Sequence, residues 1–174
     1  MDNLQIHWDN ICKIYFLTKH YLLLSEELSE DFDTFLQPLK EHRDAFDHIT
    51  RVYGYSMQKK TVEDVEKYRE DNMKKAVGHT YRAFFDTADW LSYVCRKNIR
   101  QTLSRYTKEQ ILDKYTEYEY ARKRLDEIPI EIAQIRKNKD LSDDEKELIA
   151  EVDQYAKILN ELLDIYHTVY SLFA

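Results

Sequence analysis

The sequence predicts an all-α protein, an up-and-down bundle of four to five long helices, and three observations support this prediction. Only two of the 174 residues are glycine and two are proline, so the turn residues that a β-rich fold needs are scarce. Apolar residues, 43% of the chain, recur every three or four positions over long stretches. The polar connections between these stretches are short, which favours antiparallel neighbours. The length predicts one domain over residues 1–174.

The apolar spacing predicts a first helix over residues 3–28 and a second helix from Thr34 to about Gly54. Thr34 and Gln37 have the spacing of a capping box, which satisfies free amide groups at a helix start. We expect these side chains to face the core: Leu4, Trp8, Ile11, Tyr15 and Leu22 in the first helix, and Phe35, Leu39, Phe46, Ile49 and Tyr53 in the second.

A third helix is predicted to start near Thr61 and to reach about 40 residues or more. Gly78 lies inside this helix and costs about 1 kcal/mol relative to alanine, so we expect a bend or a close helix contact there. The inner stripe is expected to continue towards Leu103 and to hold Val77, Tyr81, Phe84, Ala88, Leu91 and Cys95.

Thr107 with Gln110 predicts the start of a fourth helix, and Pro129 is expected to kink or split it. Its inner face should hold Ile111, Tyr115, Leu125 and Ile132. Ser142 with Glu145 predicts the cap of a final helix. Heptad spacing of apolar residues in that helix indicates that it packs along a long partner helix. The heptad positions are Leu148, Val152, Tyr155, Leu159, Leu162, Tyr166, Val169 and Phe173.

The composition and the missing motifs argue against several classes of function. A formal net charge of −7 gives no overall attraction for nucleic acid or anionic lipid, so such contacts must be local. Cys12 and Cys95 form no C-x-x-C pair, which predicts buried free thiols in a reducing compartment. Without a glycine-rich phosphate loop or a helical pair of metal ligands, we expect no cofactor and no metal. The chain has no apolar run of roughly 20 residues and no basic signal-peptide start, which predicts a cytoplasmic protein without membrane contact.

One short motif points to a specific chemistry. In residues 41–48, EHRDAFDH, an arginine, a polar residue and a histidine follow one another as R-D-x-x-x-H. This spacing resembles the R-x(4–6)-H signature of the HEPN superfamily, small α-helical bundles found in RNA-cleaving toxins and antiviral systems. The resemblance implies a homodimer whose cleft cleaves RNA without metal. Carried over by position, Arg43 would steady the scissile phosphate, His48 would move the proton and Asp44 would orient its neighbours.

This chemistry needs only a positioned acid–base group and a cation, because RNA supplies its own nucleophile in the 2′-hydroxyl. On the predicted helix, Asp44, His48 and Arg51 point nearly opposite the expected buried side. They form either a solvated face without catalysis or, with Asp47 four residues before Arg51, a compact mixed-charge cluster suited to a dimer cleft.

Further polar residues are candidates for substrate contacts. On the third helix, His79, Arg82, Asp86 and Asp89 follow one another at spacings of three or four residues. His79 and Arg82, together with Arg51 of the second helix, are therefore candidate substrate-binding residues. The alternative is that the residues of the third helix form intrahelical salt bridges. Basic residues and tyrosines could track an RNA backbone and stack on bases, or belong to the surface and the core edge. They are Lys97, Arg100, Arg105, Lys108, residues 122–124, Arg136, Lys137, Lys139, Tyr106, Tyr115, Tyr118 and Tyr120.

The sequence therefore supports two hypotheses. The first is a HEPN-like homodimer that acts on RNA or nucleotides. The second is a non-enzymatic interaction module, whose heptad-regular final helix and aromatic faces dock a protein partner.

Overall fold

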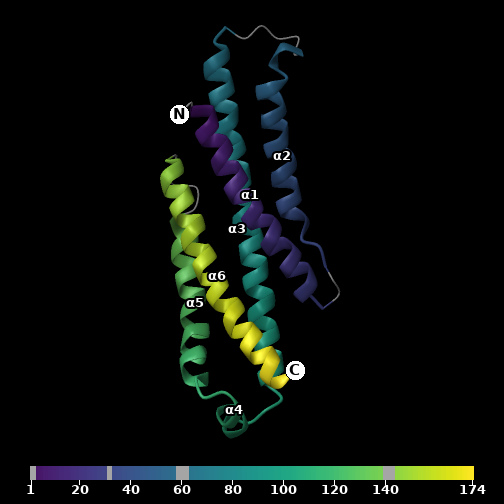
Figure 1. The fold of residues 1–174 in the computed structure, drawn as a ribbon, viewed down its shortest axis with the longest axis vertical. Helices are drawn as coiled ribbons and strands as arrows, with labels where there is room; N and C mark the ends of the chain where they lie inside the picture. Colours follow the sequence, from purple (N-terminus) through teal and green to yellow (C-terminus); the bar gives the residue numbers. More distant parts are fainter. Residues whose placement is uncertain (1–2, 31–32, 58–62, 139–143) are drawn as a thin grey trace. The chain divides into compact units, whose positions relative to one another are not determined.

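The structure, a computed structural model, describes residues 3–30, 33–57, 63–138 and 144–174. These residues contain no strand, which confirms the all-α class. None of the described helices combines the length and the apolar character needed to cross a bilayer. The described residues form six α-helices rather than four to five, because the seven-residue α4 adds to five long ones (Figure 1). The helices are α1 (Asn3–Leu28), α2 (Leu36–Tyr53), α3 (Val65–Leu103), α4 (Lys108–Lys114), α5 (Tyr118–Asn138) and α6 (Glu145–Phe173), with a 3₁₀ helix at Tyr55–Met57.

Contacts within the chain divide it into two compact units. The N-terminal unit comprises Met1–Glu27 and Asp31–Thr87, and the C-terminal unit comprises Leu28–Glu30 and Ala88–Ala174. The first part of α3 belongs to the N-terminal unit and its second part to the C-terminal unit. Each unit has buried apolar residues of its own. The prediction of one domain over the whole chain stays a prediction.

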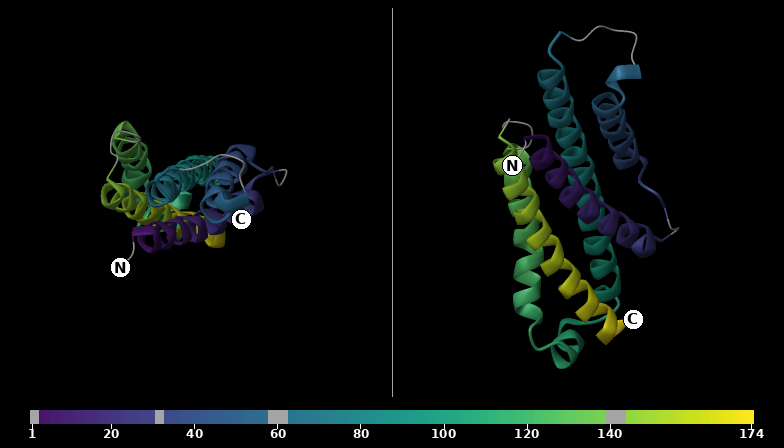
Figure 2. Two further views of the ribbon diagram at one scale, coloured as in Figure 1. Left: turned by 90° about the horizontal axis from the view of Figure 1, so that it is seen from above. Right: turned by 45° about the horizontal axis from the view of Figure 1, so that its top comes forward.

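In the N-terminal unit, α2 lies alongside the first part of α3 and runs in the opposite direction (Figure 1, Figure 2). Hydrogen bonds from His48 to Asn72 and from His79 to Glu41 join these two helices. α1 packs on α3 through aromatic rings, with the ring centroids of Tyr21 and Phe84 6.2 Å apart. Both rings are fully buried, so they anchor this core.

The buried face of α1 is rotated by about one residue from the predicted face. Trp8 and Tyr15 are exposed rather than buried. Thr18 and Ser25 are buried because their hydroxyl groups donate to carbonyl oxygens in the preceding turn of the helix. A pattern that counts only apolar residues misses such positions. The observed buried residues are His7, Ile11, Ile14, Thr18, Tyr21 and Ser25.

The buried face of α2 is also rotated by one residue. Leu39, Phe46 and Tyr53, predicted to be inside, are exposed, whereas Pro38, Ala45 and Val52 are buried. Hydrogen-bonding side chains of α2 face α3 and fix this rotation, so small residues rather than aromatic ones fill the contact.

The sequence predicts the end of α2 correctly but not its start. The helix ends at Gly54 as expected, and the Gly54 N–H donates to the Thr50 carbonyl. It begins at Leu36 with Phe35 as N-cap and no side-chain cap, so the predicted capping box is wrong. The backbone of Phe35 is extended, and Thr34 therefore lies one position too early to reach the first amides.

The predicted inner stripe of α3 is confirmed, because its members from Val77 to Cys95 are completely or almost completely buried. The helix has 39 residues and begins at Val65; Thr61 lies outside the described residues. Thr80 and Thr87 are buried in the same helix, and each hydroxyl group donates to the carbonyl oxygen four residues earlier. The helix itself therefore satisfies these buried polar groups.

Gly78 lies in uninterrupted helix and makes no close helix contact among the described residues. A methyl group added there would meet only the Arg82 Nη1 atom, at 3.6 Å. We therefore expect Gly78→Ala to raise the free energy of unfolding by about 0.5–1 kcal/mol, through lower chain entropy in the unfolded state. Urea denaturation followed by circular dichroism measures this change. Ala133→Gly, at an exposed position of α5, should shift stability by a similar amount in the opposite direction. A destabilised Gly78→Ala variant would contradict the open space seen here.

In the C-terminal unit, α5 and α6 lie side by side and run in opposite directions (Figure 1, Figure 2). The Tyr155 hydroxyl of α6 donates to Asp89 of α3 at 2.6 Å, and Arg136 of α5 pairs with the same carboxylate. The predicted heptad face of α6 is confirmed, since all its members are buried: Leu148, Val152, Tyr155, Leu159, Leu162, Tyr166, Val169 and Phe173.

The break between the next helices lies elsewhere than predicted. Thr107 and Gln110 form the expected capping box. The helix that they start ends after about two turns, because Tyr115 is extended with φ −126° and ψ 90°. A new helix begins at Tyr118 and continues through Pro129, so the predicted split at the proline is wrong, and the alternative of a kink there stays a prediction. Burial of the Tyr115 ring against Tyr118 accompanies this break, which no glycine or proline marks.

The start of α6 is capped by Asp144, whose carboxylate accepts from the Lys146 N–H at 2.9 Å. Glu145 is the first residue of the helix. The predicted cap residue Ser142 lies outside the described residues.

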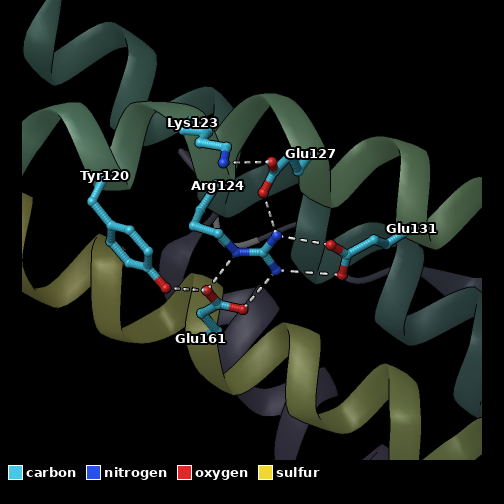
Figure 3. Close-up of polar contacts among 6 residues, drawn as sticks. All are labelled: Tyr120, Lys123, Arg124, Glu127, Glu131 and Glu161. Atoms are coloured by element: carbon cyan, nitrogen blue, oxygen red, sulfur yellow. Dashed lines mark hydrogen bonds and ion pairs between the residues drawn. The ribbon is translucent and has the colours of Figure 1, made fainter.

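A cluster of charged residues joins α5 to α6, and Arg124 is its centre (Figure 3). Its guanidinium donates twice to Glu161 of α6, from Nε at 2.7 Å and from Nη2 at 2.9 Å. Nη1 lies 2.7 Å from both Glu127 and Glu131 of α5. Only 15% of the Arg124 side chain is exposed. We call Arg124 and these three carboxylates the Arg124 cluster.

Candidate functional site

Polar side chains from α2 and α3 meet on the N-terminal unit. Glu41 and His48 come from α2, and Asn72, His79 and Arg82 come from α3. Their spacing places them one or two helical turns apart, so they face one another across the contact between the two helices. We call these five residues the α2–α3 polar cluster.

Glu41 holds two members of this cluster. Its Oε2 atom lies 2.8 Å from His79 Nδ1 and accepts from Arg82 Nε at 3.1 Å. Burial alone would raise the pKa of the Glu41 carboxyl, but the hydrogen bonds from His79 and Arg82 outweigh burial and lower that pKa below its ordinary value. Glu41 is therefore a carboxylate at neutral pH.

The hydrogen bonds of Asn72 define the tautomer of His48. The Asn72 amide nitrogen donates to the Tyr68 carbonyl at 2.8 Å, which turns its amide oxygen towards His48. That oxygen lies 2.9 Å from His48 Nδ1. Because an amide oxygen can only accept, Nδ1 carries the hydrogen and Nε2 of neutral His48 keeps its lone pair. Such a nitrogen can remove a proton from a substrate.

The two histidine rings are stacked, with centroids 5.3 Å apart and planes inclined by 22°. His79 Nδ1 also lies 2.8 Å from Arg82 Nη2. Nδ1 cannot donate to Glu41 and accept from Arg82 at once, so the two contacts correspond to different tautomers. The negative charge of Glu41 favours the form with hydrogen on Nδ1.

Three of the six predicted site residues belong to the α2–α3 polar cluster, and the other three lie outside it. His48, His79 and Arg82 belong to the α2–α3 polar cluster. Arg43 donates to Asp44 from Nε and Nη2, and 74% of its side chain is exposed. Five helical positions separate Arg43 from His48, a rotation of about 140°, so the two ends of the motif face different directions. Arg51 pairs with Asp47 on the exposed surface of α2.

Asp44 lies at the edge of the cluster. The hydrogen bond from Arg43 lowers the pKa of the Asp44 carboxyl, and the nearby charges of His79 and His48 lower it further. Asp44 thus extends the negative side of the site towards solvent. Sequence reasoning missed Glu41 and Asn72, although Asn72, His79 and Arg82 keep seven- and three-residue spacing, a signal for one helix face.

A hollow of about 400 Å³ lies between α1 and α2, on another face of α2. Its lining is almost entirely apolar and includes Trp8, Tyr15, Phe16 and Phe46. Phe16 and Phe46 are 67% and 65% exposed. His42 also lines it; burial lowers the pKa of this imidazole, and its Nε2 atom has no hydrogen-bond partner among the described residues. We call this feature the α1–α2 hollow.

The described residues hold no group of three or more histidine, cysteine, aspartate or glutamate side chains placed to bind a metal ion. Cys12 and Cys95 are both free thiols; Cys95 is buried and Cys12 is half-buried. The α2–α3 polar cluster is thus an arrangement of acid–base groups and one guanidinium. No family model, curated protein or solved structure that was compared with this chain matches it.

Proposed function

We propose that this chain is a HEPN-like protein that acts on RNA or nucleotides as a metal-independent endoribonuclease, with its long helices in an up-and-down bundle. The observation that carries the proposal is the stacked pair of His48 and His79, fixed by Asn72 and Glu41 and flanked by Arg82. Two imidazoles and a guanidinium are the groups that RNA transesterification needs. The proposal includes a cytoplasmic homodimer with a role in toxin or antiviral systems, as the resemblance implies.

In the proposed reaction, His48 Nε2 removes the proton of a ribose 2′-hydroxyl. The 2′ oxygen forms a bond to the adjacent phosphorus, and the bond from phosphorus to the 5′ oxygen breaks. Protonated His79 gives a proton to the leaving 5′ oxygen, so the products are a 2′,3′-cyclic phosphate and a 5′-hydroxyl. His48 has then gained one proton and His79 has lost one, and exchange with water restores both.

Arg82 stabilises the charge that develops on the phosphate, the role that the resemblance gives to Arg43. Arg43 and Arg51 are exposed on α2 and contact neighbouring phosphates of the RNA in this proposal. Asp44 holds Arg43 through their hydrogen bonds.

The test is cleavage of a mixed RNA pool in the presence of EDTA, with detection of 2′,3′-cyclic phosphate ends. The wild type should cleave, and His48→Ala should lower the rate about hundredfold or more, because a positioned base is lost. His20→Ala, at an exposed position of α1, is the matched control and should cleave like the wild type. Intact RNA with folded wild-type protein, or an equal loss in both variants, would refute the proposal.

A second candidate is the non-enzymatic interaction module, or a relative that binds RNA without cleaving it. The observation that favours the module is the α1–α2 hollow with its exposed aromatic residues, since exposed apolar patches commonly mark protein contacts. A second copy of the chain, docked through these helical faces, is the partner that we propose. Folded wild-type protein that leaves RNA intact would favour this candidate.

A further inference from the structure

A second hollow lies in the C-terminal unit, where the end of α3, α4 and the first turns of α5 meet. Its volume is about 370 Å³, within the range of small-molecule sites. Each of the three helices contributes one basic residue to its lining: Arg100, Lys108 and Arg122. Tyr106 and Tyr118 line it as well. We call it the α3–α5 hollow.

The charges of this lining are unbalanced. Lys108 pairs with Glu119 at 2.6 Å. In the part of the chain that the structure describes, no direct ion pair or hydrogen bond engages the guanidinium of Arg100 or Arg122. Among the described residues that line the hollow, Asp126 is the only one with a carboxylate. The protein as a whole carries a net charge of −7, so this convergence of cations runs against its average charge. Two exposed arginine forks that make no direct hydrogen bond or ion pair with the described residues are suited to a phosphate group.

Much of the remaining lining is apolar. Ile99, Leu103 and Ile111 line the hollow and are buried side chains. Tyr106 is held in place, because its hydroxyl donates to the Phe173 carbonyl at 2.9 Å. A phosphate ion alone would leave this apolar surface uncovered. A planar ring attached to the phosphate would cover it and could stack on a tyrosine, the usual platform for a base.

We propose that the α3–α5 hollow binds a phosphate monoester that carries a planar ring, a ligand of the nucleoside monophosphate class. Arg100 and Arg122 hold the phosphate, and Tyr118 or Tyr106 contacts the ring. The site lies wholly within the C-terminal unit, whereas the α2–α3 polar cluster lies within the N-terminal unit. The proposal therefore does not depend on ribonuclease activity.

The test is isothermal titration calorimetry of the full chain with AMP, in parallel with adenosine and with inorganic phosphate. AMP should bind more tightly than either part alone. Arg122→Gln should weaken AMP binding about tenfold or more, because a charge-assisted contact is lost. Lys123→Gln is the matched control: it makes the same change of charge at the next residue, which does not line the hollow and should leave the dissociation constant within about twofold.

Three outcomes of these titrations would overturn the proposal. Absence of AMP binding at millimolar concentration would exclude the site. Equal weakening in both variants would indicate attraction by overall charge rather than a built site. Equal affinity for AMP and inorganic phosphate would exclude the contact with a ring. RNA cleavage by protein that fails to bind AMP would leave the proposed function intact, so the two proposals fail separately.

Discussion

We expect Glu41→Gln to lower the kcat of RNA cleavage by about 10³–10⁴-fold, more than the loss of either histidine alone. This prediction rests on the proposed ribonuclease function. Glu41 accepts from His79 and from Arg82 through the same oxygen, so one substitution loosens two groups. A glutamine amide can turn its NH₂ group towards His79 Nδ1 and impose the tautomer with hydrogen on Nε2. In that tautomer Nδ1 faces a donor, so His79 is disfavoured in the doubly protonated form that gives a proton to the leaving 5′ oxygen.

The split between kcat and KM separates this role from a general structural one. A positioning carboxylate acts on the transition state, so kcat should fall while KM changes little. Asp47→Asn is the matched control, because it removes one negative charge from the same helix at a position where the carboxylate pairs with exposed Arg51. We expect its rate to stay within about threefold of the wild type. Equal losses in the two variants, or a Glu41→Gln effect confined to KM, would contradict the assignment.

The outer helices show why sequence periodicity predicts the presence of a helix better than its rotation. The limits of α1 match the predicted 3–28, yet its buried face starts from His7 rather than Trp8. In α2, Ala45 replaces Phe46 at the contact. Both helices carry apolar residues on more than one side, and hydrogen bonds decide which side faces inward. The apolar side chains left over gather at the α1–α2 hollow.

The long helices α3 and α6 were predictable, because each has one dense apolar stripe and polar residues elsewhere. The candidate site was predictable only in part. His48, His79 and Arg82 could be named from spacing on two separate helices. Their meeting depends on the register of α2 against α3, which long-range hydrogen bonds determine and which no local pattern contains. The same register leaves Arg43 on another side of α2 from His48.

The Arg124 cluster supports the prediction with the largest expected effect on stability. Arg124→Met should lower the free energy of unfolding by about 1–3 kcal/mol at pH 7. The substitution keeps much of the apolar stem but leaves three carboxylates close together without their shared cation. The estimate lies below the cost of breaking a fully buried pair, because the carboxylates are a third or more exposed. Urea denaturation of both proteins measures the difference.

The effect of Arg124 should depend on pH in one direction. Its hydrogen bonds lower the pKa of Glu161 and of Glu127 from the ordinary value of 4.5. A carboxyl with a lowered pKa in the folded state stabilises the fold above its unfolded pKa, and this contribution is lost as the pH falls through the folded pKa. The difference between wild type and Arg124→Met should therefore be full at neutral pH and shrink below about pH 4.5.

Lys123→Met is the matched control for this prediction, because Lys123 is largely exposed and lies 3.5 Å from Glu127. Its removal should change stability by less than about 0.5 kcal/mol. A double-mutant cycle of Arg124→Met with Glu161→Gln should show coupling, since these two side chains form the two-pronged pair between α5 and α6. Additive losses, or a difference that stays constant as the medium becomes more acidic, would mean that Arg124 stabilises the unit by packing of its stem rather than by its charge.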